Sequence, residues 1–254
     1  MKEAAVGFQC PDCVREGAKT QRPARTTFGG LAQADQAVVT KSIAAICVAV
    51  FIVQIATGSP LDGRGSGELE PRFGMFPGGA PFVDGIAGGE WYRLVTPMFL
   101  HAGVLHIAFN LTALISFGSL VEGLLGRWRF LALYFVAGIC GNVTSYLLAP
   151  QQTLSVGAST ALFGLFGAYF VLAKRMRADT SQVVGLIGVN LVITFVVPTI
   201  DWRGHVGGLI GGAAVAAAMA YAPRNNRTAI QVAGTAGVLA VAIILAIVRT
   251  AALN

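Results

Sequence analysis

Seven long stretches of this chain contain almost no charged residue, and they constrain the fold more than any other feature. A helix needs about 20 apolar residues to cross the hydrocarbon core of a bilayer. The stretches cover about 42–57, 95–121, 130–149, 155–173, 183–200, 204–222 and 229–248. Only helices and closed barrels satisfy their own backbone hydrogen bonds in lipid, and the sequence lacks the alternating ten-residue segments of a barrel. We therefore expect an all-α fold, a polytopic transmembrane helical bundle of seven spans.

Composition supports a membrane protein over a water-soluble globule. Only 12% of the 254 residues are charged, about half the share usual in soluble domains. The chain has 18 Lys and Arg against 12 Asp and Glu. If the N-terminus is cytoplasmic, thirteen of the eighteen basic residues fall on the cytoplasmic side, which is the positive-inside pattern. We interpret the surplus as a topology signal and expect no nucleic-acid partner. The interpretation predicts a multi-pass protein of the cell membrane with its N-terminus inside and its C-terminus outside.

The spans divide the chain into three parts. Residues 1–40 form a polar cytoplasmic tail, residues 41–222 a six-span core, and residues 223–254 a cytoplasmic loop and a seventh span. Within the core, residues 58–94 form an outer loop rich in glycine and proline. Its apolar side chains indicate packing against the bundle or in the membrane interface. The first apolar run follows a long hydrophilic segment, so we expect it to remain as a span rather than to be a cleaved signal peptide.

The tail contains a lone Cys-x-x-Cys pair, Cys10 and Cys13. Such a pair is half of a four-ligand zinc set. Three interpretations stay open: reduced thiols without a role, a zinc site shared between two chains, or the remnant of a longer domain that began before Met1. Cys47 and Cys140 lie in apolar runs, where a thiol behaves as a small hydrophobic group.

Polar side chains inside spans are costly, so each one is a candidate functional group. His101, His106 and Asn110 fall on the second span, Ser159 on the fourth and His205 on the sixth. All three spans enter from the outer face in the predicted topology, so these groups share one depth in the outer half of the membrane. Any one of them alone is more typical of helix packing. Together they indicate a site.

Small residues around Ser159 and His205 predict that their two helices pack closely. Gly157 leaves room for backbone or substrate beside Ser159, and a serine at a helix start has free backbone N–H groups next to it. Glycines on two faces of the sixth span allow close helix approach; they are Gly204, Gly208 and Gly212 on one face and Gly207 and Gly211 on the other. The fourth span offers a matching surface of Gly157, Ala161, Gly164 and Ala168. We expect Ser159 and His205 to come within hydrogen-bond distance.

At these residues the sequence resembles the rhomboid family of intramembrane serine proteases. The likeness covers roughly residues 40–222 and rests on five motifs in order: Glu90-Trp91-Tyr92-Arg93, the run from His101 to Asn110, Glu122 to Gly126, Gly157-Ala158-Ser159, and Gly204 to Gly208.

The resemblance implies a serine endopeptidase that uses no cofactor. In it Ser159 is the nucleophile, His205 is its base, and His106 and Asn110 join the Ser159 N–H in an oxyanion site. The supporting residues are His101, Gly157 and Phe163, the last expected under the ring of His205. The implied partners are single-span membrane proteins, cut in the lipid bilayer near its outer face. The resemblance also makes Arg93 a structural anchor of the outer loop and Glu122 a helix-packing residue.

Four positions depart from the family pattern. Thr160 follows the serine where glycine is usual, and we expect it to crowd the oxyanion pocket. Gly204 precedes the histidine in place of the usual alanine. Phe163 stands where tyrosine is frequent, and the loop's Trp-Arg pair appears as Tyr92-Arg93. No catalytic group is lost. We expect Asp201 to be solvated or paired with Arg203 in the outer loop rather than to act as a third catalytic member.

Two other function classes compete with the protease. One is a non-catalytic rhomboid-fold factor that binds or traffics membrane proteins; the presence of both Ser159 and His205 argues against it. The other is a metal site or transporter built on His101, His106 and His205. No His-Glu-x-x-His motif is present, and no acidic residue lies at that depth inside the spans. The pattern does not define an oligomeric state.

Overall fold

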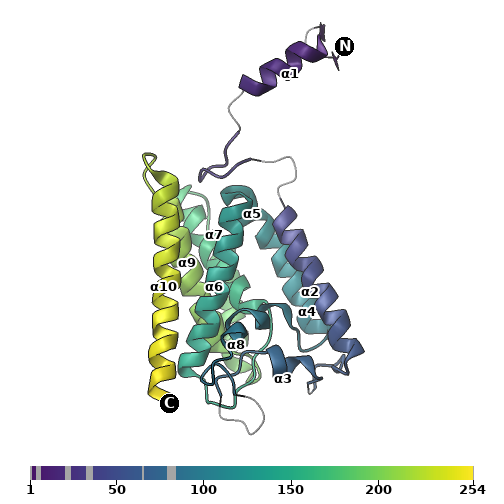
Figure 1. Ribbon diagram of the computed structural model, residues 1–254, viewed down its shortest axis with the longest axis vertical. Coiled ribbons are helices and arrows are strands. Elements are labelled where there is room, and N and C mark those ends of the chain that lie inside the picture. Colours follow the sequence, from purple (N-terminus) through teal and green to yellow (C-terminus); the bar gives the residue numbers. More distant parts are fainter. Residues whose placement is uncertain are drawn as a thin grey trace.

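The computed structural model describes residues 2–3, 7–20, 24–32, 37–64, 66–78 and 84–253. The N-terminal part holds two short antiparallel strands, β1 (Lys2–Glu3) and β2 (Phe8–Gln9), and a helix, α1 (Pro11–Thr20), which stands clear of a helical bundle (Figure 1). The remainder of the described chain consists of helices and the loops that join them. The prediction of an all-α helical bundle is therefore confirmed.

The described part of the bundle contains seven long helical segments. They are α2 (Val38–Ala56), a continuous helix made of α4 (Val104–Ala113), the π-helical η3 (Leu114–Gly118) and α5 (Ser119–Leu125), then α6 (Arg127–Leu148), α7 (Ser159–Arg175), α8 (Ser181–Val196), α9 (Trp202–Ala220) and α10 (Arg227–Leu253). Helix α7 packs against both α6 and α9 and forms the centre, whereas α10 packs on their flank (Figure 1).

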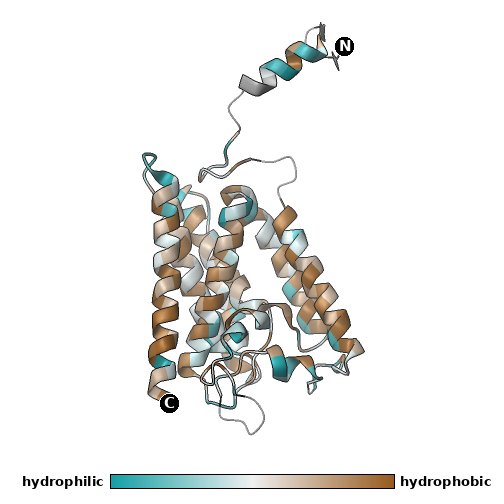
Figure 2. Cartoon of the chain, viewed as in Figure 1, coloured by the Kyte–Doolittle hydropathy of each residue, from teal (hydrophilic) through white to brown (hydrophobic). Residues whose placement is uncertain are grey.

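Four of the described helices are long and apolar enough to cross a membrane: α2, α4–α5, α6 and α10. Helix α8 is apolar but has only 16 residues. Helices α7 and α9 lie inside the bundle: most residues of α7 are buried, and α9 consists largely of glycine and alanine. Large exposed apolar side chains gather instead on outer helices such as α2 and α10. The ribbons of these two helices are coloured mostly as hydrophobic (Figure 2). The chain is a multi-pass membrane protein, and the number of seven spans stays a prediction.

Two predicted span boundaries are wrong, and tertiary contacts explain both. The second span was expected from residue 95, but residues 96–99 form a short 3-10 helix, η2 (Thr96–Phe99), and α4 begins only at Val104. The backbone of residues 61–63 approaches Gly103 so closely that a Cβ there would lie 2.7 Å from the Gly63 nitrogen. The fourth span was expected from residue 155, but Ser155 pairs as a β-bridge with Met75, and α7 begins at Ser159.

A buried carboxylate joins α2 to α5. Glu122 is 2% exposed and accepts hydrogen bonds from the backbone N–H groups of Val39 and Thr40 and from the Thr40 hydroxyl. The first N–H groups of a helix have no partner within the helix, and a carboxylate there also interacts favourably with the helix dipole. Glu122 thus holds the start of α2 against α5, as its predicted role in helix packing requires.

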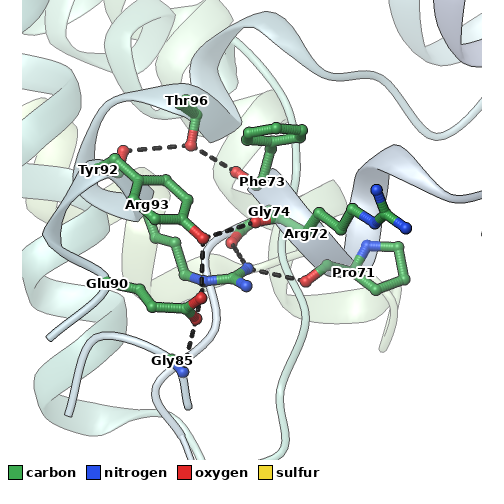
Figure 3. Close-up of polar contacts among 9 residues, drawn as sticks. All are labelled: Pro71, Arg72, Phe73, Gly74, Gly85, Glu90, Tyr92, Arg93 and Thr96. Carbon is green, nitrogen blue, oxygen red and sulfur yellow. Dashed lines mark hydrogen bonds and ion pairs between the residues drawn. The ribbon is translucent and has the colours of Figure 1, made fainter. Parts of the chain in front are cut away.

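Arg93 organises the loop between α2 and α4. The loop contains α3 (Leu69–Phe73) and the 3-10 helix η1 (Trp91–Leu94). The Arg93 side chain is 1% exposed; Nη1 donates to the carbonyls of Pro71 and Gly74 at 2.9 and 2.8 Å, and Nε donates to Glu90 at 2.7 Å (Figure 3). One guanidinium therefore links two separate segments of the loop, residues 71–74 and Glu90, which is the anchoring role expected of it.

Candidate active site

The structure brings Ser159 and His205 together at one end of the bundle. Ser159 is the first residue of α7, and His205 lies in the first turn of α9. The distance from Ser159 Oγ to His205 Nε2 is 2.7 Å, within hydrogen-bond range. Phe163, one turn further along α7, stacks on the imidazole with ring centroids 4.1 Å apart and planes 15° apart. Its aromatic face fixes the plane of the ring that faces the serine.

Glycines on α9 make this approach possible. A Cβ on Gly208 would lie 1.9 Å from the Thr160 carbonyl oxygen, and a Cβ on Gly212 would lie 2.1 Å from the Gly164 carbonyl oxygen. The backbones of α7 and α9 are therefore in direct contact. The second glycine face, with Gly207 and Gly211, packs against side chains of α6 rather than against α7. Two faces of one helix thus contact two different neighbours.

The remaining ring nitrogen of His205 has a partner that the sequence analysis did not identify. Nδ1 of His205 lies 2.8 Å from the hydroxyl oxygen of Thr194, which is 3% exposed and belongs to α8. The only available signal was a hydroxyl near the end of an apolar run, and such a hydroxyl is common in membrane helices. Both nitrogens of the imidazole are therefore engaged, one by α7 and one by α8.

His106 faces the same serine from α4. The Ala102 N–H donates to its Nδ1 at 3.1 Å, so the neutral ring carries its proton on Nε2. The site for a Cβ on Gly157 would be 2.9 Å from that Nε2 and 3.4 Å from Ser159 Oγ. Gly157 also has a φ of +134°, a conformation that favours glycine. Only a residue without a side chain leaves the space between His106 and Ser159 open.

His101 and Asn110 lie around His106. His101 is fully buried in the loop before α4, not on a span, and its ring meets the His106 ring edge-on at 5.3 Å. Gln54 clamps the His101 backbone through hydrogen bonds to its N–H and carbonyl groups. Asn110 is 5% exposed, and its side-chain nitrogen donates to the His106 carbonyl at 2.9 Å. Its observed hydrogen bond therefore supports the α4 backbone.

Two neighbouring residues make contacts that the sequence did not predict. Thr160 does not face the pocket between His106 and Ser159; its side chain packs against Gly141 of α6 and Gly204 of α9, because both glycines leave space there. Asp201 is not paired with Arg203. Its carboxylate caps α9 by accepting from the Gly204 N–H, and it also accepts from the Ser145 hydroxyl.

The start of α7 supplies main-chain donors beside the serine. The helical hydrogen bonds of α7 begin with Leu162 N–H donating to the Ala158 carbonyl. The N–H of Ser159 precedes this ladder, at the positive end of the helix dipole. A developing negative charge at this position would be stabilised by that N–H and by the Nε2–H of His106.

The cysteine pair lies away from this site. Cys10 and Cys13 are exposed free thiols at the start of α1. Backbone hydrogen bonds from Cys13 and Asp12 lower the pKa of Cys10. Within the described ranges, no three His, Cys, Asp or Glu side chains lie close enough together to hold a metal ion, and this includes the three histidines of the bundle. The proposed half zinc set stays a prediction.

Comparison with known proteins gives a consistent family assignment. The sequence profile of the Rhomboid domain matches residues 88–222. Rhomboid protease GluP of Bacillus subtilis is 46% identical over 139 residues, which cover 53% of this chain and 27% of GluP. YdcA of the same organism is 38% identical over 133 residues, covering 50% of this chain and 67% of YdcA. Rhomboid-type serine protease 2 of Emericella nidulans is 34% identical over 166 residues, covering 62% of this chain and 32% of that relative. The chain thus spans only part of the length of these relatives.

Proposed function

Because the chain belongs to the rhomboid family, we propose that it is an intramembrane serine endopeptidase that acts through a Ser159–His205 dyad. The observation that carries this proposal is the 2.7 Å distance between Ser159 Oγ and His205 Nε2. A nucleophile and a base within hydrogen-bond reach, with the base oriented by further contacts, form the arrangement required for acyl transfer. Phe163 and Thr194 supply those contacts.

Proton transfer follows from the hydrogen bonds of His205. Neutral His205 carries its proton on Nδ1 and donates it to the Thr194 oxygen, which leaves the lone pair of Nε2 facing Ser159. As Oγ attacks the peptide carbonyl carbon, Nε2 takes the hydroxyl proton and then gives it to the leaving amine. Water hydrolyses the acyl-enzyme by the same route in reverse. Thr194 acts as a positioning residue, because its oxygen accepts from the imidazolium that forms in each step.

The oxyanion would accept hydrogen bonds from the Ser159 N–H and from the Nε2–H of His106. The Asn110 side-chain amide donates one hydrogen to the backbone carbonyl of His106. Its second amide hydrogen remains for the oxyanion. Removal of a donor of this kind typically costs about 10²–10³ in kcat. The ring of His101 packs edge-on against the ring of His106 and so restricts its orientation.

The substrates are single-span membrane proteins cut within the lipid bilayer. A stable transmembrane helix hides its peptide carbonyls in its own hydrogen bonds. Segments that unwind near the outer face, with Gly, Ala or Ser at the cut, are therefore favoured. The positive-inside pattern supports insertion in the cell membrane with the N-terminus inside and the C-terminus outside. Residues 41–222 then form the catalytic core, and residues 223–254 form a cytoplasmic loop and an added span.

The test uses the full chain in proteoliposomes with a panel of single-span proteins. Wild type should cleave at least one of them and react covalently with a fluorophosphonate, whereas Ser159→Ala and His205→Ala should do neither. Ser155→Ala is the matched control, because Ser155 precedes α7 and pairs with Met75 only through its backbone. Unchanged cleavage by Ser159→Ala would refute the dyad. A wild type that binds these proteins without cleaving or reacting would favour the non-catalytic binding factor.

A further inference from the structure

A cavity lies at the opposite end of the bundle from Ser159. Helix α7 begins at Ser159 and ends at Arg175, and its 17 residues separate the two ends by about 25 Å. There the ends of α7 and α9, the start of α10 and the segment 24–32 line a cavity of about 430 Å³ that is open on one side. The residues that line it include Thr27, Phe28, Tyr221, Arg175, Arg224 and Arg227.

The cavity contains three arginines and no acidic residue among its described lining residues. Arg175 lies over the Tyr221 ring, 5.6 Å from the centroid. Arg227 reaches the Thr27 carbonyl at 3.4 Å, and its Nε is buried without a hydrogen-bond partner among the described residues. Asp179, in the neighbouring α7–α8 loop, uses its carboxylate to accept from the N–H and hydroxyl of Ser181. The positive charge in the cavity is thus left without a carboxylate.

The wall formed by residues 24–32 is held in place by specific contacts. Gln231 of α10 is 2% exposed; its Nε2 donates to the carbonyls of Phe28 and Met219, and its Oε1 accepts from Arg129. Arg129 also approaches Gly29, as Arg227 does. Like charges gathered on a packed wall repel one another, so the arrangement is most stable with an anion bound among them.

We propose that this cavity binds a phosphate group, as carried by an anionic phospholipid headgroup or by free phosphate. Guanidinium groups suit phosphate because they donate paired hydrogen bonds to its oxygens. The volume falls within the range of small-molecule sites. The C-terminal ends of α7 and α9 each carry a partial negative charge of at most about half a unit, which disfavours an anion. The three arginines carry three full positive charges and outweigh them. In the proposed topology this end faces the leaflet that carries anionic lipid.

The experiment measures thermal stabilisation of Ser159→Ala protein, so that its outcome does not depend on proteolysis. The protein is reconstituted in phosphatidylcholine vesicles with and without phosphatidylglycerol, and separately in phosphatidylcholine with inorganic phosphate. Phosphatidylglycerol should raise the melting temperature, and native mass spectrometry should show the lipid retained. A stabilisation equally large with inorganic phosphate would identify free phosphate as the source.

Arg175→Gln and Arg227→Gln should each weaken retention about tenfold to a hundredfold, the usual loss for a charged hydrogen bond. Arg177→Gln is the matched control: it removes the same charge at the same end, but Arg177 is exposed and does not line the cavity. Arg175 contacts the Tyr221 ring and lies on the surface, so its variant should melt like the parent in phosphatidylcholine alone. An equal response of all three variants would mean that only the general charge of the leaflet matters and would overturn the site. No stabilisation of the parent by either anion would overturn it as well.

Discussion

Substitution of Gly208 by alanine tests whether backbone contact between α7 and α9 sets the geometry of the dyad. The new Cβ would lie 1.9 Å from the Thr160 carbonyl oxygen and 2.9 Å from its carbonyl carbon. These are main-chain atoms in the first turn of α7, one residue from Ser159. They cannot rotate aside as the end of a flexible side chain could. The helices must therefore separate.

The size of the separation follows from the contact distance. Ordinary van der Waals contact of a Cβ begins at 3.4 Å, so α9 must move by about 1.5 Å. A shift of that size takes Ser159 Oγ and His205 Nε2 from 2.7 Å to about 4 Å, beyond hydrogen-bond range. Overpacking of this kind costs about 1–3 kcal/mol of stability. Misplacement of reacting groups by about 1 Å lowers the rate about a hundredfold.

The assay compares the melting temperature and the rate of fluorophosphonate labelling per folded molecule in proteoliposomes. Gly188→Ala is the control, because it makes the same change in α8, where a Cβ would meet nothing within 4 Å. Gly208→Ala should melt lower and label about a hundredfold more slowly, whereas Gly188→Ala should behave like wild type. If Gly208→Ala labels at the wild-type rate and melts unchanged, the contact does not set the dyad, and the reasoning fails.

Three further predictions concern groups outside the glycine interface. Thr194→Val removes the partner of His205 Nδ1 at nearly constant volume; kcat should fall about tenfold to a hundredfold with little change in KM, and Thr194→Ser should restore most of it, since a hydrogen bond to a charged group is worth about 1.5–3 kcal/mol. An equal loss of kcat in Thr194→Val and Thr194→Ser would exclude a role for this hydrogen bond in catalysis. Glu122→Gln should lower the melting temperature without slowing labelling of the folded fraction, because it weakens the cap of α2 far from Ser159; an unchanged melting temperature would contradict the capping role. Burial alone would raise the pKa of Glu90, but hydrogen bonds from Arg93, from Tyr92 and from a loop N–H lower it below its ordinary value of 4.5. The ionised carboxylate therefore stabilises the folded loop above pH 4.5, and this stabilisation is lost as the pH falls through the lowered value. Melting curves of wild type should show this loss, and those of Glu90→Gln should not; parallel pH profiles would refute it.

The sequence predicted those features that depend on local pattern. Long uncharged runs predicted the helices, because lipid tolerates few charges and no unpaired backbone. Glycine spacing on the sixth span predicted that Ser159 and His205 would meet, because helix periodicity places residues four apart on one face. The structure agrees with both, although only one of the two glycine faces contacts α7.

The features that were missed depend on contacts between distant segments. The start of α4 is displaced by a loop that passes Gly103, and the start of α7 by the bridge between Met75 and Ser155. No local signal marks either contact. Thr194 was overlooked for a related reason: a hydroxyl in a membrane helix usually bonds its own backbone. Only the placement of α8 beside α9 turns that hydroxyl toward His205.

Thr160 and Gly204 show how two apparent departures from a family pattern become one structural feature. In sequence they are 44 positions apart and look independent, one residue larger than usual and the other smaller. In the structure a Cβ on Gly204 would lie 2.8 Å from Cγ2 of Thr160, so the methyl group of one occupies the space left by the other. Gly141 of α6 faces the same side chain, with Thr160 Cβ 2.8 Å from the place where its own Cβ would lie. The two glycines together leave room for Thr160, so α7 and α9 stay in contact. This explains why an additional side chain directly after Ser159 leaves the serine within reach of His205.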